Sequence, residues 1–210
     1  MTKLLLATRS PDKTREIREI AAGSGLEIVS LVEARVGWRP EEERIEEHDS
    51  FLGNARAKAE YFSKLGGLPT VADDSGLEVL SLGGAPGVRS KRFAPDAARL
   101  SGKALDAANN AELLRQLLGA AASQRRACYV CGAVLIRSPG GIPEGFTGRC
   151  WGAILEAARG SNGFGYDPLF FHEALGKTFG EATAQEKHGV SHRGAAFREL
   201  VSALVERPLV

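Results

Sequence analysis

The sequence has little cysteine, almost no net charge and no long hydrophobic run, and each shortage excludes a class of protein. Lysine and arginine number 27 against 26 aspartates and glutamates, a net charge of +1, which predicts no electrostatic surface for nucleic acid or an anionic membrane. No apolar run approaches the roughly 20 residues of a membrane-spanning helix, and the apolar stretch at the N-terminus is too short for a signal peptide. We therefore expect a cytoplasmic protein that binds any anion through a local site.

The three cysteines exclude a disulfide framework and a zinc site. Cys128 and Cys131 form a C-x-x-C pair inside an apolar, β-branched run, and Cys150 lies in a second such run. No further C-x-x-C or H-x-x-H completes a zinc set. We expect reduced thiols carried by strands.

What is present is the composition of an ordinary globular protein. The 210 residues are 43% hydrophobic and 25% charged, which allows a sizeable core and argues against disorder. The length suits one α/β domain. We expect a single domain over residues 1–210, with two lobes.

Hydrophobic periodicity predicts helices and strands in mixed order. The last two long helices should turn Leu118 and Val205, among others, toward the core. Two long β-like runs joined by SPGGIPEG indicate a hairpin, so we expect a mixed sheet rather than a purely parallel one. The expected strands are 3–7, 26–32, 69–74, 127–137, 146–156 and 169–171, and the expected helices run from Pro11 to Gly23 or Gly25, from Ser50, over 104–118 and over about 190–206.

The segment ATRSPDK, residues 7–13, is a candidate anion site. Ser10 is a plausible N-cap, Pro11 suits the first helical position, and Lys13 lies in the first turn. A strand that opens directly into a helix places backbone N–H groups and the positive helix end together. The alternative is a capped helix with a solvated lysine, and the glycines of a P-loop are absent.

Acidic residues form a second candidate site. Glu46 and Glu47 precede the helix that follows Ser50, and Asp73 and Asp74 stand together in VADDSGLEV. Hard oxygen ligands without a histidine pair suit Mg²⁺, which leaves positions for water and substrate phosphates. The alternatives are a solvated acidic loop for the glutamates and a turn cap for the aspartates.

Two further segments carry aromatic and basic side chains. In GFGYDPLF, Phe164 stands between glycines and could stack on a nucleobase, while Asp167 could accept from a ring N–H. In EKHGVSHRG, donors gather before the last helix and could read carbonyl oxygens or ligate phosphate, with Ser191 as a possible N-cap. A core-filling aromatic loop and structural or solvated basic residues are the alternatives. The donors are Lys187, His188, His192 and Arg193.

Together these segments resemble the inosine triphosphate pyrophosphatase family. The resemblance runs in order through ATRSPDK, FLGNARAKA, ADDSGLEV, GGAPGVRSKRF, GFGYDPLF and SHRGAA. It implies an α/β fold with a mixed, elongated, twisted sheet, flanking helices and two lobes around a central cleft, usually in a homodimer. It also implies Mg²⁺-dependent hydrolysis of non-standard purine nucleoside triphosphates (dITP, ITP, XTP) to the monophosphate and pyrophosphate, which cleanses the nucleotide pool.

The resemblance also assigns residues. Asp74 would be the proton acceptor and, with Glu46, a metal ligand, while Asp73 would support the turn that aims Asp74. Hypoxanthine and xanthine carry a 6-carbonyl acceptor, whereas the 6-amino group of adenine would leave the site's donors without partners. The residue that rejects guanine is not evident. The implied substrate-binding residues are Thr8, Arg9, Ser10, Pro11, Asp12, Lys13, Lys58, Ser75, Phe164, Gly165, Tyr166, Asp167, Lys187, His192 and Arg193.

The chain departs from the family pattern in three places. Ser10 replaces a usual asparagine, the acidic loop reads IEEHD so that Glu46 and Glu47 are both candidate ligands, and Arg89 and Lys91 replace tyrosine and alanine. Two other functions stay open at this point. One is a pyrophosphatase for modified pyrimidine nucleotides, similar to the Maf group, and the other is a nucleotide-binding module without turnover.

Overall fold

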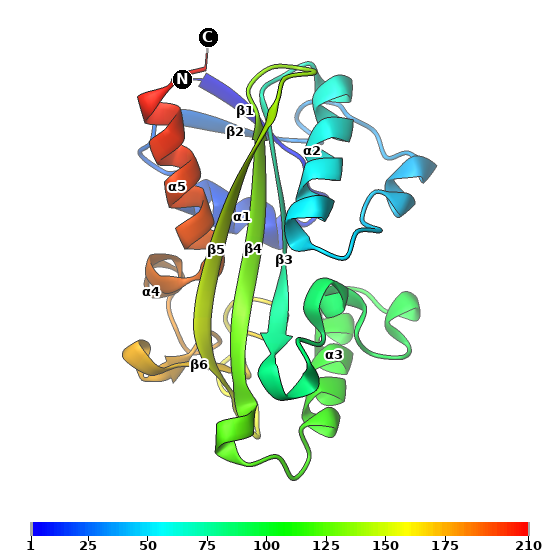
Figure 1. Ribbon diagram of the computed structural model, residues 1–210, viewed down its shortest axis with the longest axis vertical. Helices are drawn as coiled ribbons and strands as arrows, with labels where there is room; N and C mark the ends of the chain where they lie inside the picture. Colours follow the sequence, from blue (N-terminus) through cyan, green and yellow to red (C-terminus); the bar gives the residue numbers. More distant parts are fainter. Residues whose placement is uncertain (1, 210) are drawn as a thin grey trace. The chain divides into compact units, whose positions relative to one another are not determined.

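The computed structural model describes residues 2–209, whose seven strands are hydrogen-bonded in one sheet (Figure 1). The strands are β1 (Thr2–Leu6), β2 (Leu26–Ser30), β3 (Thr70–Val79), β4 (Arg126–Ile136), β5 (Pro143–Ile154), β6 (Phe170–His172) and β7 (Lys177–Thr178). The α-helices are α1 (Pro11–Ile20), α2 (Phe51–Gly66), α3 (Gly102–Gln116), α4 (Ala184–Val190) and α5 (His192–Glu206).

The sheet is mixed, which confirms the predicted α/β fold class. Its strand order is β2-β1-β3-β4-β5-β6-β7. β1 pairs in parallel with β2 and β3, whereas β6 pairs antiparallel with β5 and β7. β4 and β5 are neighbours joined directly by residues 137–142, as the predicted hairpin requires.

The chain divides into two compact units, and three strands contribute residues to both. Unit 1 comprises Met1–Asp74, Cys131–Gly148 and His192–Val210, and unit 2 comprises Ser75–Val130 and Arg149–Ser191. The division cuts β3, β4 and β5. The expectation of a single domain over 1–210 stays a prediction.

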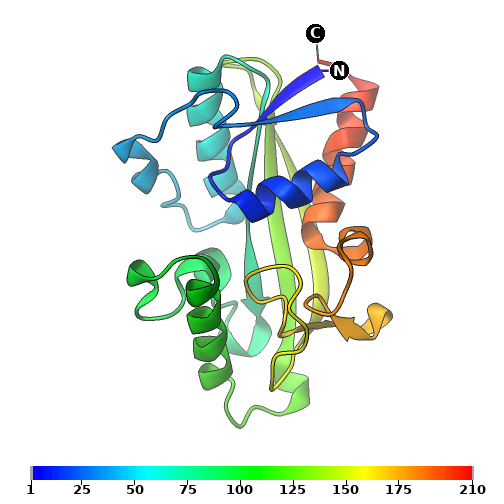
Figure 2. The ribbon, with the colours of Figure 1, turned by 180° about the vertical axis from the view of Figure 1, so that it is seen from behind.

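In unit 1, successive residues of β1 serve two different cores. Leu4 and Leu6 of β1 pack with Phe197 on the side of α1 and α5 (Figure 2). Leu5 and Ala7 instead pack with residues of α2. Side chains alternate across a strand with a period of two, so a strand covered on both faces reads as an unbroken apolar run. This explains the KLLLA pattern of β1.

In unit 2, α3 packs on the other ends of the shared strands. Leu113 and Leu117 join Leu77 of β3 in a core that includes an aromatic group. The rings of Phe170 and Phe179 have centroids 5.0 Å apart. Aromatic side chains bury much area per residue, so this small unit has a dense core.

The structure corrects several sequence predictions. β3 does not end at Asp74 but continues to Val79, so no turn follows the aspartate pair. The expected last helix, over about 190–206, is α5, and a further helix that the sequence analysis did not predict, α4, precedes it. Leu118 is 86% exposed because α3 ends before it, at Gln116, and Val205 is 70% exposed because it lies beside the buried stripe of α5 that contains Leu204. α1 ends at Ile20, before either predicted glycine.

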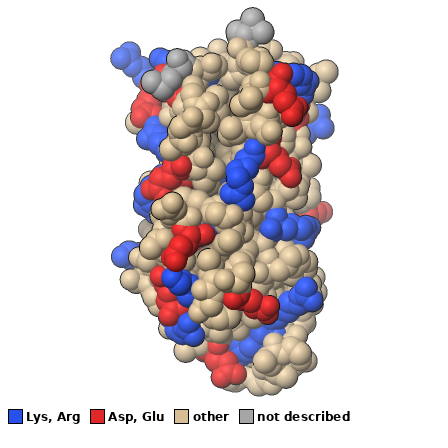
Figure 3. Space-filling view, turned by 90° about the vertical axis from the view of Figure 1, so that its left-hand side faces the viewer, with Lys and Arg blue, Asp and Glu red and all other residues tan. Residues whose placement is uncertain are grey.

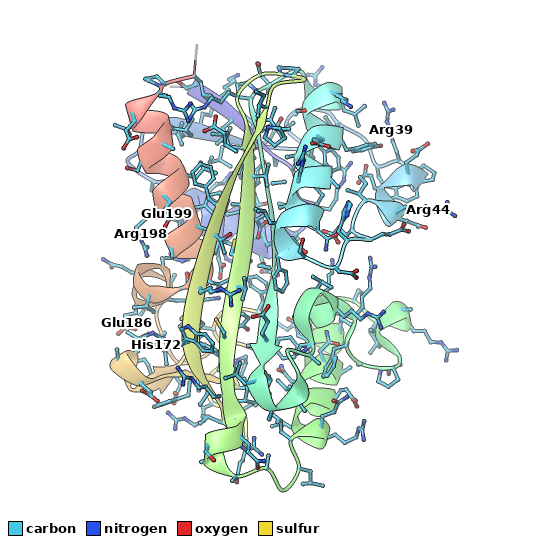
Figure 4. All side chains as sticks on the ribbon, viewed as in Figure 1. Arg39, Arg44, His172, Glu186, Arg198 and Glu199 are labelled. Carbon is cyan, nitrogen blue, oxygen red and sulfur yellow. The ribbon has the colours of Figure 1, made fainter. Side chains whose placement is uncertain are left out.

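The described surface carries both signs of charge. Figure 3 shows Lys and Arg side chains interspersed with Asp and Glu on one face. Arg198 and Glu199 project from the side of α5 that faces away from the strands (Figure 4). Among residues 2–209, no helix is both long and apolar enough to cross a membrane. The three cysteines are buried, free thiols on β4 and β5, as predicted.

Candidate active site

The segment after β1 forms a capped helix start, as predicted. The Ser10 hydroxyl accepts from the Lys13 backbone N–H at 3.3 Å, and Pro11 occupies the first turn. A proline costs nothing there, because the first N–H groups of a helix have no partner inside it. The Lys13 ammonium turns toward β3 and lies 3.1 Å from Asp73 Oδ2. Lys13 is therefore a fixed charge and not a solvated lysine.

Arg9 in the same segment holds a neighbouring loop. Its guanidinium lies 2.7 Å from Glu42 Oε1 and donates to the carbonyl oxygens of Val36 and Gly37. Glu42 belongs to the 3-10 helix Pro40–Arg44, in a charge-dense stretch shortly before Glu46 and Glu47. This arrangement ties that stretch to the end of β1.

α2 places an amide and an ammonium on one buried stripe. Ser50 caps the helix by accepting from the Gly53 N–H. Asn54 and Lys58, four residues apart, share a face and are both buried. Asn54 Nδ2 donates to Asp74 Oδ2 at 2.9 Å, and its Oδ1 accepts from the His48 N–H. Asn54 thus joins β3 to the acidic loop, a role that its spacing from Lys58 could have indicated.

Lys58 lies between two carboxylates. Its Nζ is 2.5 Å from Glu46 Oε1 and 4.0 Å from Asp74 Oδ1, and it donates to the Asp73 carbonyl oxygen at 2.6 Å. Burial alone would lower the pKa of Lys58, but the carboxylates of Glu46 and Asp74 outweigh it and raise that pKa. Lys58 therefore stays charged at neutral pH.

Asp73 is fully buried and belongs to a charge network. Its Oδ2 lies 3.1 Å from Lys13 Nζ and 3.3 Å from Arg193 Nε, and Arg193 also pairs with Glu16. Burial raises the pKa of Asp73, but Lys13 and Arg193 outweigh it and hold that pKa well below its ordinary range. The predicted role of Asp73 as support for a turn is wrong, because the strand does not turn there.

Asp74, the next residue along β3, has the opposite electrostatic balance. It is 9% exposed. Burial raises the pKa of Asp74, and the opposing effects of Lys58, Lys13 and the Asn54 hydrogen bond do not cancel the rise. A carboxylate whose pKa is raised accepts a proton more readily. Asp73 is therefore a counter-ion of Lys13 and Arg193, whereas Asp74 is a candidate base.

The donor set of unit 1 fits a magnesium ion with two protein ligands. Glu46 and Asp74 face the same ammonium, so a positive charge is already stabilised between them. Mg²⁺ prefers carboxylate oxygens and keeps waters or phosphates at its other positions. Residues 2–209 contain no cluster of three or more His, Cys, Asp or Glu able to hold a metal. Glu46 and Glu47 are both exposed, and the geometry favours Glu46 as the ligand because it pairs with Lys58, which also faces Asp74.

In unit 2, Lys187 and Asp167 form a buried ion pair beside aromatic rings. Lys187 Nζ lies 2.5 Å from Asp167 Oδ2 and 5.1 Å from the ring centroid of Phe164. Asp167 Oδ2 also accepts from the Phe164 N–H at 2.8 Å. Gly163 has φ +71°, and a Cβ there would meet the Asp167 carboxylate, so only glycine fits. Phe164 is half-buried, with part of its ring exposed.

The remaining predicted site residues are divided between the two units. Tyr166 is buried in the core of unit 2, where its hydroxyl donates to the Ser90 carbonyl oxygen at 2.7 Å. Lys187 lies on α4 in unit 2, whereas His192 and Arg193 begin α5 in unit 1. The donors predicted to crowd one turn thus belong to two helices. Thr8, Asp12 and Ser75 are half-buried.

The fold and these two sites define a class of α/β protein that combines a lysine-carboxylate centre with an aromatic ion-pair site. The profile of the Ham1 family matches residues 4–203. The chain belongs to the Ham1 family.

Named relatives and a solved structure agree with this membership. A dITP/XTP pyrophosphatase of Thermus thermophilus is 43% identical over 98% of this chain and 93% of its own. The dITP/XTP pyrophosphatase of Ralstonia nicotianae is 44% identical over 97% of both chains. A HAM1 protein from Coxiella burnetii, 34% identical, superposes with a TM-score of 0.82 and covers 98% of this chain and 100% of that one. The predicted family resemblance is confirmed.

Proposed function

We propose that this chain hydrolyses the non-standard purine nucleoside triphosphates dITP, ITP and XTP to the monophosphate and pyrophosphate, with Mg²⁺ as cofactor. Its membership of the Ham1 family makes it a nucleoside triphosphate pyrophosphatase, a hydrolase of phosphoric anhydrides. The proposal concerns its substrates, its metal and the residues that act.

One observation carries the proposal. The backbone oxygen of Asp73 accepts from both Lys58 Nζ at 2.6 Å and Lys13 Nζ at 3.5 Å. Two ammonium groups are thus held at one point of β3, directly beside the candidate base Asp74. Convergent fixed positive charge is what a triphosphate needs as negative charge moves onto its leaving group.

The roles of the side chains follow from this arrangement. Asp74 would accept a proton from water as the water oxygen bonds to the α-phosphorus and the bond to the bridging oxygen breaks. Pyrophosphate then leaves with that electron pair. Lys13 and Lys58 would bind the phosphate oxygens, and Glu46 with Asp74 would hold Mg²⁺. When bound, the metal supplies further positive charge against the phosphates.

Base recognition is assigned to the Phe164 site. The exposed part of the Phe164 ring would stack on the purine, and Lys187, fixed by Asp167, would donate to the 6-carbonyl oxygen of hypoxanthine or xanthine. Adenine presents a donor at that position and would leave the ammonium without an acceptor. Contacts from Ser75, His192 and Arg193 to the nucleotide stay predictions, as do the cytoplasmic location and the homodimer.

Pyrophosphate release across a nucleotide panel, with and without Mg²⁺, tests the proposal. We expect Mg²⁺-dependent release from dITP, ITP and XTP, with ATP and GTP at least about 10-fold slower in kcat/KM. Comparable rates on all five would contradict the specificity. Faster turnover of methylated UTP or CTP would point to modified pyrimidines instead. Calorimetric binding of ITP without release over hours would indicate a binding module.

A further inference from the structure

α3 carries two side chains that hold the backbone of one residue, Gly165, in the loop 163–167. Asp106 Oδ2 accepts from the Gly165 N–H at 2.9 Å, and Asn110 Nδ2 donates to the Gly165 carbonyl oxygen, also at 2.9 Å. Both residues are half-buried, and all three belong to unit 2. Asp106 and Asn110 are four residues apart, so they lie on one face of α3. The N–H and the carbonyl oxygen of Gly165 are thus each held by a hydrogen bond to a side chain of α3.

This grip acts on a turn that is also closed by a backbone hydrogen bond, in which the Asp167 N–H donates to the Phe164 carbonyl oxygen at 3.3 Å. Gly165 has φ +64°, and no atom lies within 4 Å of where a Cβ would be. Gly165 has no side chain to pack, and glycine is the residue with the most conformational freedom. The two hydrogen bonds from α3 add to the turn in restricting it. The peptides on each side of Gly165 are shared with Phe164 and Tyr166, so their orientation is set as well.

The neighbouring contacts show that the grip concerns Phe164 more than Tyr166. Tyr166 is anchored independently by its core packing and its bond to the Ser90 carbonyl oxygen. Phe164 is only half-buried; its N–H is held by Asp167, and its ring lies near Lys187. Fixing the peptide that follows Phe164 completes the restraint on the residue that presents a ring.

We propose that Asp106 and Asn110 form a clamp that positions Phe164 for purine stacking, and that this clamp sets affinity for the base rather than the rate of the chemical step. The inference rests on the proposed function for its consequence but not for its geometry. Asp106 and Asn110 are positioning residues, because they act through the N–H and the carbonyl oxygen of Gly165.

α3 itself offers matched controls. Glu112 is on the same helix and holds Arg115 and Gln116, each at 2.8 Å, with no bond to the loop 163–167. Glu112→Ala removes comparable hydrogen bonds without loosening the clamp. Asp106→Asn keeps an acceptor oxygen for the Gly165 N–H and serves as the conservative rescue of Asp106→Ala.

Two measurements separate the clamp from its consequence. Amide hydrogen exchange should accelerate in residues 163–166 of Asp106→Ala and Asn110→Ala, and stay unchanged there in Glu112→Ala. The same two variants should raise KM for dITP roughly 10-fold with kcat within about twofold. Asp106→Asn should recover most of the loss. Because both bonds hold the backbone of one residue, the double variant should cost less than the product of the single effects.

Each outcome decides something. Unchanged exchange in both alanine variants would overturn the clamp. Faster exchange with an unchanged KM, or a fall confined to kcat, would overturn its role in base affinity. Inhibition by pyrophosphate, which carries no base, should be the same in all variants, and a parallel loss there would also overturn that role. If the unaltered protein releases no pyrophosphate from any nucleotide, the proposed function fails, while the exchange result still decides whether the clamp exists.

Discussion

The two units bury charge in different ways. In unit 1, Asp73 and Glu16 both pair with Arg193. Beside this network, Lys13 and Lys58 both donate to the Asp73 carbonyl oxygen. Unit 2 holds one buried pair, Lys187 with Asp167, among aromatic rings. Burying charge is costly unless it is compensated, so the network suits binding of a polyanion and a cation. In the proposed function, the Lys187–Asp167 pair, which also accepts from the Tyr129 hydroxyl and the Phe164 N–H, would face a ligand group that is polar but uncharged, such as a purine edge.

The largest expected effect tests the centre of unit 1. Asp74→Asn removes the proton acceptor and should lower kcat for dITP by about 10³-fold, within the range for general base catalysis. Circular dichroism should show an unchanged fold. Asp96→Asn, at an exposed position in unit 2, is the control and should leave kcat as it is. A kcat for Asp74→Asn within tenfold of the original would remove Asp74 from the mechanism.

The second prediction compares the two kinds of burial directly. Arg193→Met removes the guanidinium that Asp73 and Glu16 share, and should lower the free energy of unfolding by about 3–5 kcal/mol. Lys187→Met should cost less, because Asp167 keeps the N–H of Phe164. Urea denaturation of both variants measures the difference. An equal or larger loss in Lys187→Met would contradict the distinction between network and pair.

A smaller effect distinguishes two neighbouring glutamates. Glu46→Gln should raise the Mg²⁺ concentration that gives half-maximal rate by roughly 10-fold, since a neutral amide oxygen is a weaker ligand than a carboxylate. The exposed Glu47→Gln is the matched control and should not change it. A shift produced by Glu47→Gln alone would assign the metal to the other glutamate.

The smallest expected effect concerns thiol reactivity. Burial raises the pKa of Cys131 in unit 1 and of Cys150 in unit 2, each to about 12. At pH 8 both are protonated, and the thiolate is the reactive form. Ellman's reagent should therefore modify neither during an hour in the folded protein. Burial also raises the pKa of Cys128, though Arg149 beside it opposes the rise, so any early reaction should occur there. Reaction of Cys131 first would contradict this order.

Local signals in the sequence predicted the elements that local physics controls. Ser10 and Pro11 marked the start of α1, and Ser50 marked the start of α2; the structure confirms both. The prediction that β3 ends at Asp74 was wrong for a physical reason. Two adjacent carboxylates are unfavourable inside a buried strand, and only partners distant in sequence, Lys13 and Arg193, make Asp73 acceptable there.

Site residues with distant partners could not be predicted in the same way. Glu16 reads as one more charge on an amphipathic helix, and nothing local shows that it pairs with Arg193. Asp106 and Asn110 have the spacing of an ordinary exposed helix face, and their target is a glycine backbone far along the chain. Backbone hydrogen-bond partners leave no mark on the sequence of the residue that is bound.

The alternation of β1 between two cores limits how the length of this chain can change. Adding or deleting one residue within β1 would exchange the side chains that face α2 with those that face α1 and α5. Both cores would then be mispacked by a single event, whereas substitution of one leucine affects only one of them. Insertions and deletions should therefore accumulate in connections such as residues 137–142, while the spacing from β1 to Lys13 stays constant.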